Sequence, residues 1–491
     1  ESRGLGDVYK RQNPYWVAAN NGNKFIDNHT YGNVDLTYEI IPGLKAIGRI
    51  GGDFNDSRRK AMNGVARYSA DSYSAAGGKS ASEGSYLEHN ESRTQLDVTG
   101  LLDANYNISK DVNLSGFLGW NYNYRDLELI DSYLYNLNVP GWYSLENGST
   151  DPTTYSRVYS RRLYGALGQA ELGFRNYLYF TLSGRNDWSS TLPKDNRSFF
   201  YWGSSASLIV TDMAPSIKSD WLNYLKVRLA YGKTGKDANW YLTSNEYQPT
   251  KIALGFGNLN LPLNGVPGLT LGNTRGNQNL KPEITREAEF GFDLRLFDSR
   301  VNVDFSYYDR NTKDQIIAAT QAYETGYGSY TKNVGEIQNR GVEIAVGFVP
   351  VRTRDWNWNF NVTFAKNNSE VKKLWEVDGK EIKEYVVTSA YSVDFVAEVG
   401  EPLGVFKVPK VQTTEDGQIV VNASTGRPLV VSGEKEKVGT SAPDFTMGFV
   451  NRVSWKNISL GVVVDWRKGG EFWSCLLYTS ASPRDSTSSR M

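Results

Sequence analysis

Residues 162–187, RLYGALGQAELGFRNYLYFTLSGRND, contain two long runs in which apolar and polar positions alternate. In the first run Tyr164 and Leu172 share one face with small residues, and Gln169 and Glu171 share the other. A period of two indicates strands, and the short link between the runs indicates an antiparallel hairpin. Each run is far longer than an ordinary strand of about 5–6 residues, so its length needs a separate explanation.

The same alternation recurs along the interior of the chain and predicts fourteen strands. Helical periodicity is confined to a short turn predicted near residues 214–222. The predicted strands cover residues 33–41, 44–56, 94–108, 111–125, 160–175, 177–188, 198–210, 222–234, 284–297, 300–311, 339–349, 356–367, 444–455 and 457–468. The chain is therefore predicted to be all-β.

The connections between these strands alternate between short and long. Short turns such as Pro42-Gly43 and Lys456-Asn457 alternate with segments that mostly exceed the ~12–15 residues common for loops of compact domains. Tight turns at one edge and long loops at the other are typical of outer-membrane barrels. A strand that crosses the apolar band of a membrane at a tilt needs about 9–11 residues, which explains the strand length.

Aromatic residues gather near strand ends, as in residues 199–202 and 356–358, as expected of the girdles at membrane interfaces. We therefore predict a transmembrane antiparallel β-barrel that is partial, with about 14 of the roughly 22 strands of a plugged barrel and without its plug domain. Strands 33–41 and 457–468 should then be unpaired on one side. A soluble sandwich or propeller is the alternative, but its strands would be shorter and its loops more even.

Composition removes several other classes of protein. The 491 residues hold 54 basic and 54 acidic side chains, a balance that gives no reason to expect nucleic acid as a partner. No run approaches the ~18 apolar residues of a transmembrane helix, and no secretory signal opens the sequence. The two histidines, His29 and His89, lack Cys or carboxylate neighbours at ligand spacing, so we predict no catalytic site, no metal site and no cofactor.

The two ends share no pattern with the interior. Residues 1–12 and 475–491 resemble translated adapter or primer sequence, with genuine disordered tails as the alternative. The barrel segment is therefore expected to be residues 13–474. The single cysteine, Cys475, then lies in a tail and says nothing about redox compartment.

Several stretches, in chain order, resemble SusC/RagA-like TonB-dependent outer-membrane transporters. The most specific is NVGEIQNRGVEIAV, which is similar to the family pattern N-x-G-x-x-x-N-x-G-V-E. The matching segments are residues 13–16, 183–190, 225–235, 279–316, 333–346, 399–407 and 441–471. The family's carboxypeptidase-like domain, TonB box, plug and final strands have no counterpart, so the resemblance covers the middle of the barrel.

This resemblance implies active import by a multi-pass protein of the outer membrane of a Gram-negative, Bacteroidetes-like bacterium. The implied partners are outer-membrane lipid, a SusD-like surface lipoprotein that closes over the barrel, and the TonB–ExbB–ExbD complex that acts on the plug. The implied cargo is oligosaccharide, or peptide. A siderophore or cobalamin receptor and a porin remain alternatives, and a soluble β-rich carbohydrate-binding protein is a remote one.

Candidate ligand contacts are loop aromatics, which can stack on sugar rings, and charged residues predicted to face the lumen. They are Trp142, Tyr143, Arg185, Asp187, Trp188, Trp240, Tyr241, Tyr327 and Tyr391. Their alternative roles are membrane anchoring, loop packing, contact with the lipoprotein, or a solvated charge lattice. Within the family motif, Gly335, Asn339, Gly341 and Glu343 are interpreted as structural, with glycines that allow a bend or bulge where the loop re-enters the wall.

Overall fold

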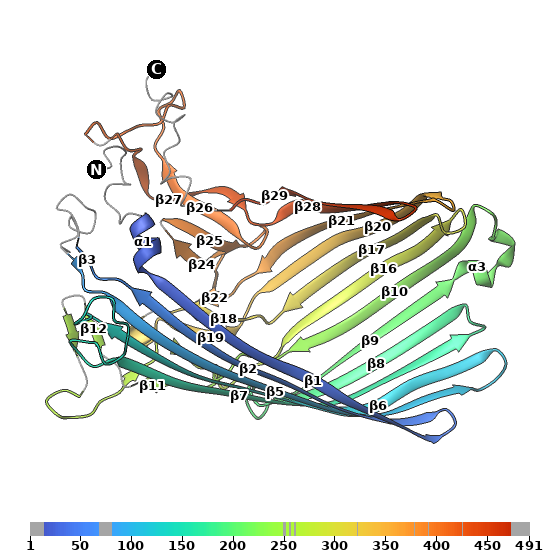
Figure 1. Ribbon diagram of the computed structural model, residues 1–491, viewed down its shortest axis with the longest axis horizontal. Helices are drawn as coiled ribbons and strands as arrows, with labels where there is room; N and C mark the ends of the chain where they lie inside the picture. Colours follow the sequence, from blue (N-terminus) through green and yellow to red (C-terminus); the bar gives the residue numbers. More distant parts are fainter. Residues whose placement is uncertain are drawn as a thin grey trace.

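The computed structural model describes residues 14–67, 81–248, 252–254, 257–259, 262–321, 323–377, 379–390, 392–424 and 426–472. The predicted tails and Cys475 lie outside these residues, and so does the candidate contact Tyr391. Most of the described chain forms one curved antiparallel sheet, the wall, with short turns at one end and long connections at the other (Figure 1).

The wall contains fourteen strands in the order β1-β2-β5-β6-β7-β8-β9-β10-β16-β17-β20-β21-β28-β29, so every predicted strand is confirmed. Their bounds are β1 Gly22–Ile41, β2 Leu44–Asn63, β5 Ser85–Asn107, β6 Val112–Tyr135, β7 Thr153–Phe174, β8 Leu178–Ser189, β9 Ser198–Ile209, β10 Leu222–Lys236, β16 Glu283–Leu296, β17 Val301–Lys313, β20 Glu336–Arg352, β21 Trp356–Lys373, β28 Pro443–Trp455 and β29 Ile458–Gly469. Each strand pairs with its sequence neighbour within the wall, which is the meander expected of an outer-membrane barrel.

Several strands extend well beyond their predicted limits at the long-loop end. β1 begins at Gly22 rather than at residue 33, and β6 continues to Tyr135 rather than to residue 125. In this upper part both faces of the sheet mix polar and apolar residues, as in LELIDSYLY at residues 127–135, so hydropathy no longer alternates although the backbone pairing continues. The predicted loops 57–93 and 126–159 are correspondingly too long.

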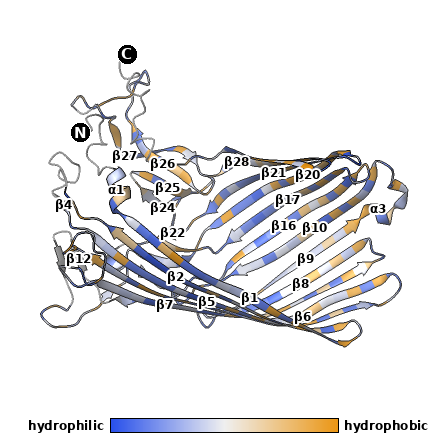
Figure 2. Cartoon of the chain, in the orientation of Figure 1, coloured by the Kyte–Doolittle hydropathy of each residue, from blue (hydrophilic) through white to orange (hydrophobic). Residues whose placement is uncertain are grey.

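Over much of the wall, hydrophilic and hydrophobic residues alternate along the strands (Figure 2). On β6, Leu118 and Trp120 point to the outer face and are 72% and 53% exposed. On the inner face of the same strand, Asn121 and Asn123 donate hydrogen bonds to Asp97. A sheet with an apolar outside and a hydrogen-bonded polar inside matches a wall between lipid and an aqueous lumen.

The wall does not close into a complete barrel. Among the described residues β1 pairs only with β2, and β29 pairs only with β28, so one side of each strand is open (Figure 1). The prediction of two half-paired edges is confirmed. Backbone N–H and C=O groups without a hydrogen-bond partner cannot remain exposed in lipid. Each such group costs on the order of several kcal/mol, as a buried unsatisfied polar group does in a protein interior.

The long connections form a crown of small sheets above the wall, which the sequence did not predict. The largest is a four-stranded sheet in the β21–β28 connection, here called the crown sheet, formed by β24, β25, β26 and β27. The crown strands are β3 Ala66–Arg67, β4 Ala81–Ser82, β11 Tyr247–Gln248, β12 Ile252–Leu254, β13 Gly257–Leu259, β14 Thr270–Leu271, β15 Thr274–Arg275, β18 Ile316–Thr320, β19 Ser329–Asn333, β22 Glu376–Val377, β23 Lys380–Glu381, β24 Glu384–Ala390, β25 Val393–Glu398, β26 Val405–Val411 and β27 Val430–Thr440.

The helical segments within the described residues are short. They are α1 Pro14–Asn20, α3 Val210–Met213, and the 3₁₀ turns η2 Pro215–Ile217 and η3 Tyr323–Thr325. The predicted turn near residues 214–222 therefore lies slightly earlier, and α1 was not predicted. The described part of the chain holds no helix that is long and apolar enough to cross a membrane.

The buried apolar clusters of the described residues lie where the crown meets the long-loop ends of the wall strands. The largest cluster joins Val371 and Leu374, at the end of β21, to Trp375 and to Ala397 of the crown sheet. Val396 and Val405, also in the crown sheet, are fully buried. The wall instead exposes its apolar side chains outward, where lipid would cover them. The crown sheet is thus packed onto the wall and is not a free loop.

The crown sheet contains a nearly buried carboxylate whose ion pair should make it sensitive to acid. The Lys435 ammonium and the Ser389 hydroxyl donate hydrogen bonds to Asp394 and hold the pKa of its carboxyl below the ordinary value. A lowered folded-state pKa contributes stability above about pH 4, and this contribution is lost as the pH falls toward the folded pKa. We expect Asp394→Asn to weaken the crown sheet at pH 6, with a difference from wild type that shrinks below pH 4.

Hydrogen exchange of the β25 amides, corrected for intrinsic rates, measures this effect. Asp416→Asn, at an exposed hairpin turn in the same connection, is the matched control and should leave β25 protection unchanged at both pH values. A difference between Asp394→Asn and wild type that is as large at pH 3 as at pH 6 would contradict the assignment.

Candidate functional site

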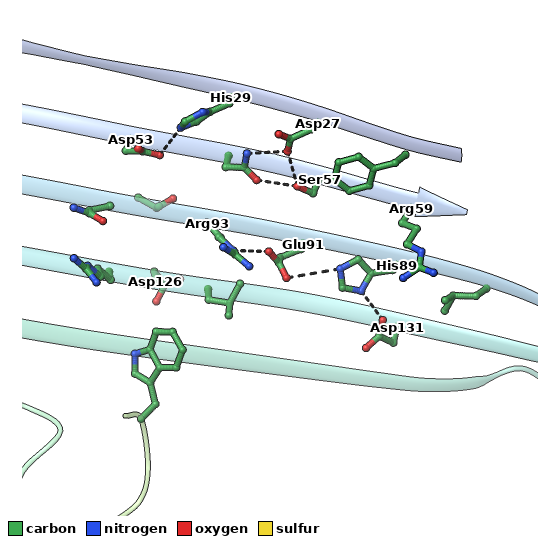
Figure 3. Close-up of a pocket in the computed structure, with 18 of the residues that line it drawn as sticks. Asp27, His29, Asp53, Ser57, Arg59, His89, Glu91, Arg93, Asp126 and Asp131 are labelled. Carbon is green, nitrogen blue, oxygen red and sulfur yellow. Dashed lines mark hydrogen bonds and ion pairs between the residues drawn. The ribbon is translucent and has the colours of Figure 1, made fainter. Parts of the chain in front are cut away.

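The inner face of β1, β2, β5 and β6 carries a cavity of about 1000 Å³ near the crown. Alternate residues of these strands point into it, because side chains two apart lie on the same face of a sheet. Polar and charged side chains from adjacent strands therefore meet there, as Figure 3 shows for its labelled residues. We call this cavity the lumenal pocket.

Both histidines of the chain face the lumenal pocket, and each contacts a carboxylate from a neighbouring strand. His29 Nε2 lies 2.9 Å from Asp53 Oδ1. His89 Nδ1 lies 2.6 Å from Asp131 Oδ1, and its Nε2 is 3.7 Å from Glu91 (Figure 3). These partners come from neighbouring strands, so the spacing of residues along the sequence did not reveal them.

The remaining charges of the lumenal pocket are mostly held by polar neighbours. Arg93 Nε is 2.5 Å from Glu91 Oε1, and Asp27 accepts hydrogen bonds from Ser57 at 2.6 Å and Asn55 at 2.8 Å. Arg125 also lines the pocket, is exposed, and makes no ion pair with any residue that the structure describes. The pocket thus presents many hydrogen-bond donors and acceptors, and its carboxylates already have polar partners.

One aromatic residue of the lumenal pocket, Trp240, comes from the long β10–β16 connection. Its ring lies 5.4 Å from that of Tyr159 on β7, and the Tyr241 ring lies 5.9 Å from the same tyrosine. The backbone N–H of Ser160 also donates to the Tyr241 hydroxyl at 3.4 Å. The start of this connection therefore folds back over the inner face of the wall and adds an aromatic surface to a polar pocket.

A nearly buried ion pair fixes this connection three residues before Trp240. Both Nε and Nη2 of Arg161 donate to the Asp237 carboxylate, at 2.8 and 2.7 Å. Ser189 and Thr191 donate to the same carboxylate at 2.5 and 3.0 Å. The Asp237 side chain is only 10% exposed. We call this group the Asp237 clamp, since it ties β10 to β7 and β8.

Chemically, the lumenal pocket is suited to bind a polar molecule. The described residues contain no group of three or more His, Cys, Asp or Glu placed to hold a metal ion. An aromatic face beside a dense set of donors and acceptors is the common composition of a binding site for a polar ligand with apolar patches.

Arg185 and Asp187 are two of the predicted ligand contacts. They lie on the inner face of the wall, outside the lumenal pocket. Arg185 Nε is 2.7 Å from Asp187 Oδ1, and the Tyr201 hydroxyl donates to Asp187 at 2.7 Å. Asp187 is 4% exposed. Because its carboxylate is already occupied by these partners, it is placed to support the wall rather than to meet a cargo.

The predicted aromatic contacts are scattered, and only Trp240 lines the lumenal pocket. Trp188 alternates with Asp187 and points to the outer face, 40% exposed. Trp142 is exposed in the β6–β7 connection, and the Tyr143 hydroxyl there donates to the backbone of Asn20 at 3.2 Å. Tyr327 is half-buried in the β18–β19 connection.

The family-motif residues occupy the re-entry of the chain into the wall. Gly335 has a φ of +89° just before β20, as expected of a bend that needs glycine. Gly341 lies in regular pairing with Tyr308 and forms no bulge; its missing Cβ leaves room for the Tyr308 ring. Asn339 accepts a hydrogen bond from Asn367 at 3.0 Å, and Glu343 lies opposite Ser306.

Sequence reasoning missed most of the lumenal pocket because it assigned the upper strands to loops. The sequence does contain one signal of the pocket. In residues 85–93, ionisable side chains occupy every second position at His89, Glu91 and Arg93, and the residues between them, Asn90 and Ser92, are uncharged. A charged residue at every second position indicates a strand whose polar face is functional or solvated. The partners Asp53 and Asp131 could not be assigned, because their pairing depends on strand register.

Comparison with known proteins identifies relatives along nearly the whole chain. TonB-dependent receptor SusC of Bacteroides thetaiotaomicron is 24% identical over 482 residues, which cover 91% of this chain and 44% of SusC. TonB-dependent receptor P26 of Formosa agariphila is 26% identical over 393 residues, which cover 75% of this chain and 38% of that receptor. The chain thus spans less than half the length of these relatives.

The structure of the RagAB peptide transporter has a similar fold, with a TM-score of 0.73 and 20% sequence identity, covering 92% of this chain and 49% of that one. The similarity to SusC in sequence and to the RagAB transporter in fold confirms the resemblance to SusC/RagA-like receptors. These receptors form β-barrels of the outer membrane and are not a class of enzymes. A family model described as TonB dependent receptor-like, beta-barrel matches residues 2–429, so the chain belongs to the TonB-dependent receptor β-barrel family.

Proposed function

We propose that this chain forms part of an active importer in the outer membrane of a Gram-negative bacterium, and that its cargo is an oligosaccharide. The observation that carries the proposal is the lumenal pocket, where Trp240 is held over a polar surface on the inner face of the wall. Import would use a SusD-like lipoprotein above the crown and TonB–ExbB–ExbD below, which the relatives' family supports.

The polarity of the lumenal pocket favours a neutral, hydroxyl-rich cargo. Its carboxylates are largely matched by arginine, histidine or amide partners, so a strongly charged ligand would have to displace existing pairs. Sugar hydroxyls can instead add hydrogen bonds to such pairs without replacing them, since a carboxylate accepts more than one. A sugar ring also offers an apolar face for the Trp240 side chain.

Binding of oligosaccharides to the full chain in lipid nanodiscs tests the proposal, with Trp240→Ala and Trp188→Ala compared by isothermal titration calorimetry. Loss of one stacked aromatic should weaken binding by roughly tenfold, about 1.4 kcal/mol. Trp188→Ala removes the same side chain from the outer face and should leave the affinity unchanged. Far-ultraviolet circular dichroism checks that both variants keep the wall.

A panel of neutral oligosaccharides and of peptides separates the two cargo classes. Saturable binding of oligosaccharides that depends on Trp240 supports the proposal. Binding of peptides alone would assign the pocket to peptide import, and equal losses for the two tryptophan variants would remove the lumenal pocket from the cargo path.

A further inference from the structure

The outer face of the wall carries a second hollow, a groove of about 450 Å³ across β8, β9, β10, β16 and β17. Small residues, Ser204, Ala206 and Ala288, leave the groove open, and the larger Tyr231, Phe290 and Tyr307 flank it. The three flanking rings are 45%, 40% and 41% exposed. On an outer-membrane barrel this apolar groove faces the hydrocarbon of the membrane.

Two cationic side chains lie directly above the groove, at its end nearest the crown. Lys233 of β10 is paired in register with Arg286 of β16, and the next outward-facing pair below them is Tyr231 with Ala288. Like charges directly opposite each other on a sheet are destabilising. Neither side chain makes an ion pair with any residue that the structure describes, so their repulsion is not relieved within the chain.

Nearby carboxylates on the same outer face do not neutralise this pair. Asp309, which borders the groove, is bound by Arg340 at 2.9 Å and by Gln338 at 2.8 Å. Glu336 accepts a hydrogen bond from Asn311 at 2.6 Å and pairs with Lys313 at 3.2 Å. The positive charges of Lys233 and Arg286 are therefore available to an external anion.

The height of the pair on the wall matches the headgroup level of a membrane. Two residues below Lys233 on β10, the Tyr231 ring lies 5.8 Å from the ring of Trp202 on β9. Below these aromatics, β10 presents Leu229, Val227 and Leu225 outward at every second position. Aromatic rings mark the membrane interface, and cations just beyond it reach the lipid phosphates.

We propose that Lys233 and Arg286 bind the phosphate group of an anionic lipid, one of whose acyl chains lies in the adjacent groove. The site is on the opposite face of the wall from the lumenal pocket and is independent of cargo import. An anionic headgroup between the two cations removes their repulsion, and an acyl chain covers the apolar groove. One ligand thus accounts for two features that nothing in the chain itself explains.

The full chain in a nonionic detergent, titrated with dioleoylphosphatidic acid and with dioleoylphosphatidylcholine, tests this site. The variant Lys233→Gln/Arg286→Gln should bind phosphatidic acid roughly 30-fold more weakly, or about 2 kcal/mol for two cations. The control Lys110→Gln/Lys218→Gln removes two charges at the short-turn end and should bind like wild type. Phosphatidylcholine should bind weakly to all three proteins.

Equal affinity of the double variant and wild type for phosphatidic acid would overturn the proposal. Displacement of the lipid by millimolar inorganic phosphate would overturn the proposal that an acyl chain lies in the groove, because a simple anion site would then explain the binding. If Lys233→Gln/Arg286→Gln does not fold, Ala288→Phe fills the groove without changing charge. That variant should also lose affinity for phosphatidic acid, and wild-type binding by it would count against the groove.

Discussion

Replacement of Asp237 by alanine is expected to release the β10–β16 connection from the wall and to raise its local opening by roughly 100-fold. The variant leaves the Arg161 guanidinium, only 18% exposed, without its bidentate partner, and it removes the acceptor of Ser189 and Thr191. Removal of one member of a buried ion pair costs about 3–5 kcal/mol, because the remaining charge is left desolvated. A cost of about 3 kcal/mol corresponds to that 100-fold change.

Hydrogen exchange of peptides covering residues 237–248 measures the opening directly. The matched control is Asp111→Ala, which removes the partner of Arg175 at a short turn, where both side chains are more than half exposed. A pair in that environment contributes about 0–1 kcal/mol, so exchange should change little. Equal protection of residues 237–248 in wild type and Asp237→Ala would show that the connection is held by its other contacts.

The clamp matters for the site because it fixes the chain three residues before Trp240. If the connection opens, the Trp240 ring leaves Tyr159 and no longer lies over the lumenal pocket. Asp237 is therefore a positioning residue: its loss should lower oligosaccharide affinity in the same sense as Trp240→Ala, while the double variant should add little to either single one. Strongly non-additive effects are expected when one residue acts only through the other.

The wall could be predicted from the sequence because its signal is local. Each strand crossing the apolar band must present an apolar residue outward at every second position, and this pattern, as in Leu178, Phe180 and Leu182, is visible without knowledge of the partner strand. The crown carries no such pattern. Its strands are short, and their burial depends on contacts such as that between Val371 and the crown sheet, which are distant in sequence.

The lumenal pocket was missed for a related physical reason. The contacts of His29 with Asp53 and of His89 with Asp131 depend on which residues stand beside each other across strands, and a shift of one residue would turn each side chain to the other face. Hydropathy fixes that register only where one face is apolar. The upper strands mix polar and apolar residues on both faces, so hydropathy indicated neither their extent nor their partners.

Gly116 of β6 illustrates how closely two strands of the wall approach, and its replacement by alanine should destabilise the chain by about 2–3 kcal/mol. A Cβ at this position would overlap the backbone carbonyl oxygen of Gln169 on β7 and would lie 3.0 Å from the Cα of Ala170. Both obstacles are backbone atoms, so no side-chain rotation can relieve the overlap. The strands must separate instead, which weakens the hydrogen bonds between β6 and β7.

The variant Gly48→Ala supplies the matched comparison, because Gly48 also faces outward from the wall and a Cβ there meets nothing within 4 Å. Alanine restricts the unfolded chain more than glycine does, so this variant should be neutral or more stable by about 0.5–1 kcal/mol. Urea titration of both variants in phosphatidylcholine vesicles, followed by tryptophan fluorescence, measures the two free energies of unfolding. The opposite signs are the informative result: equal destabilisation would mean that any added methyl group disturbs the wall, and that the close approach of β6 and β7 at Gly116 has no special role.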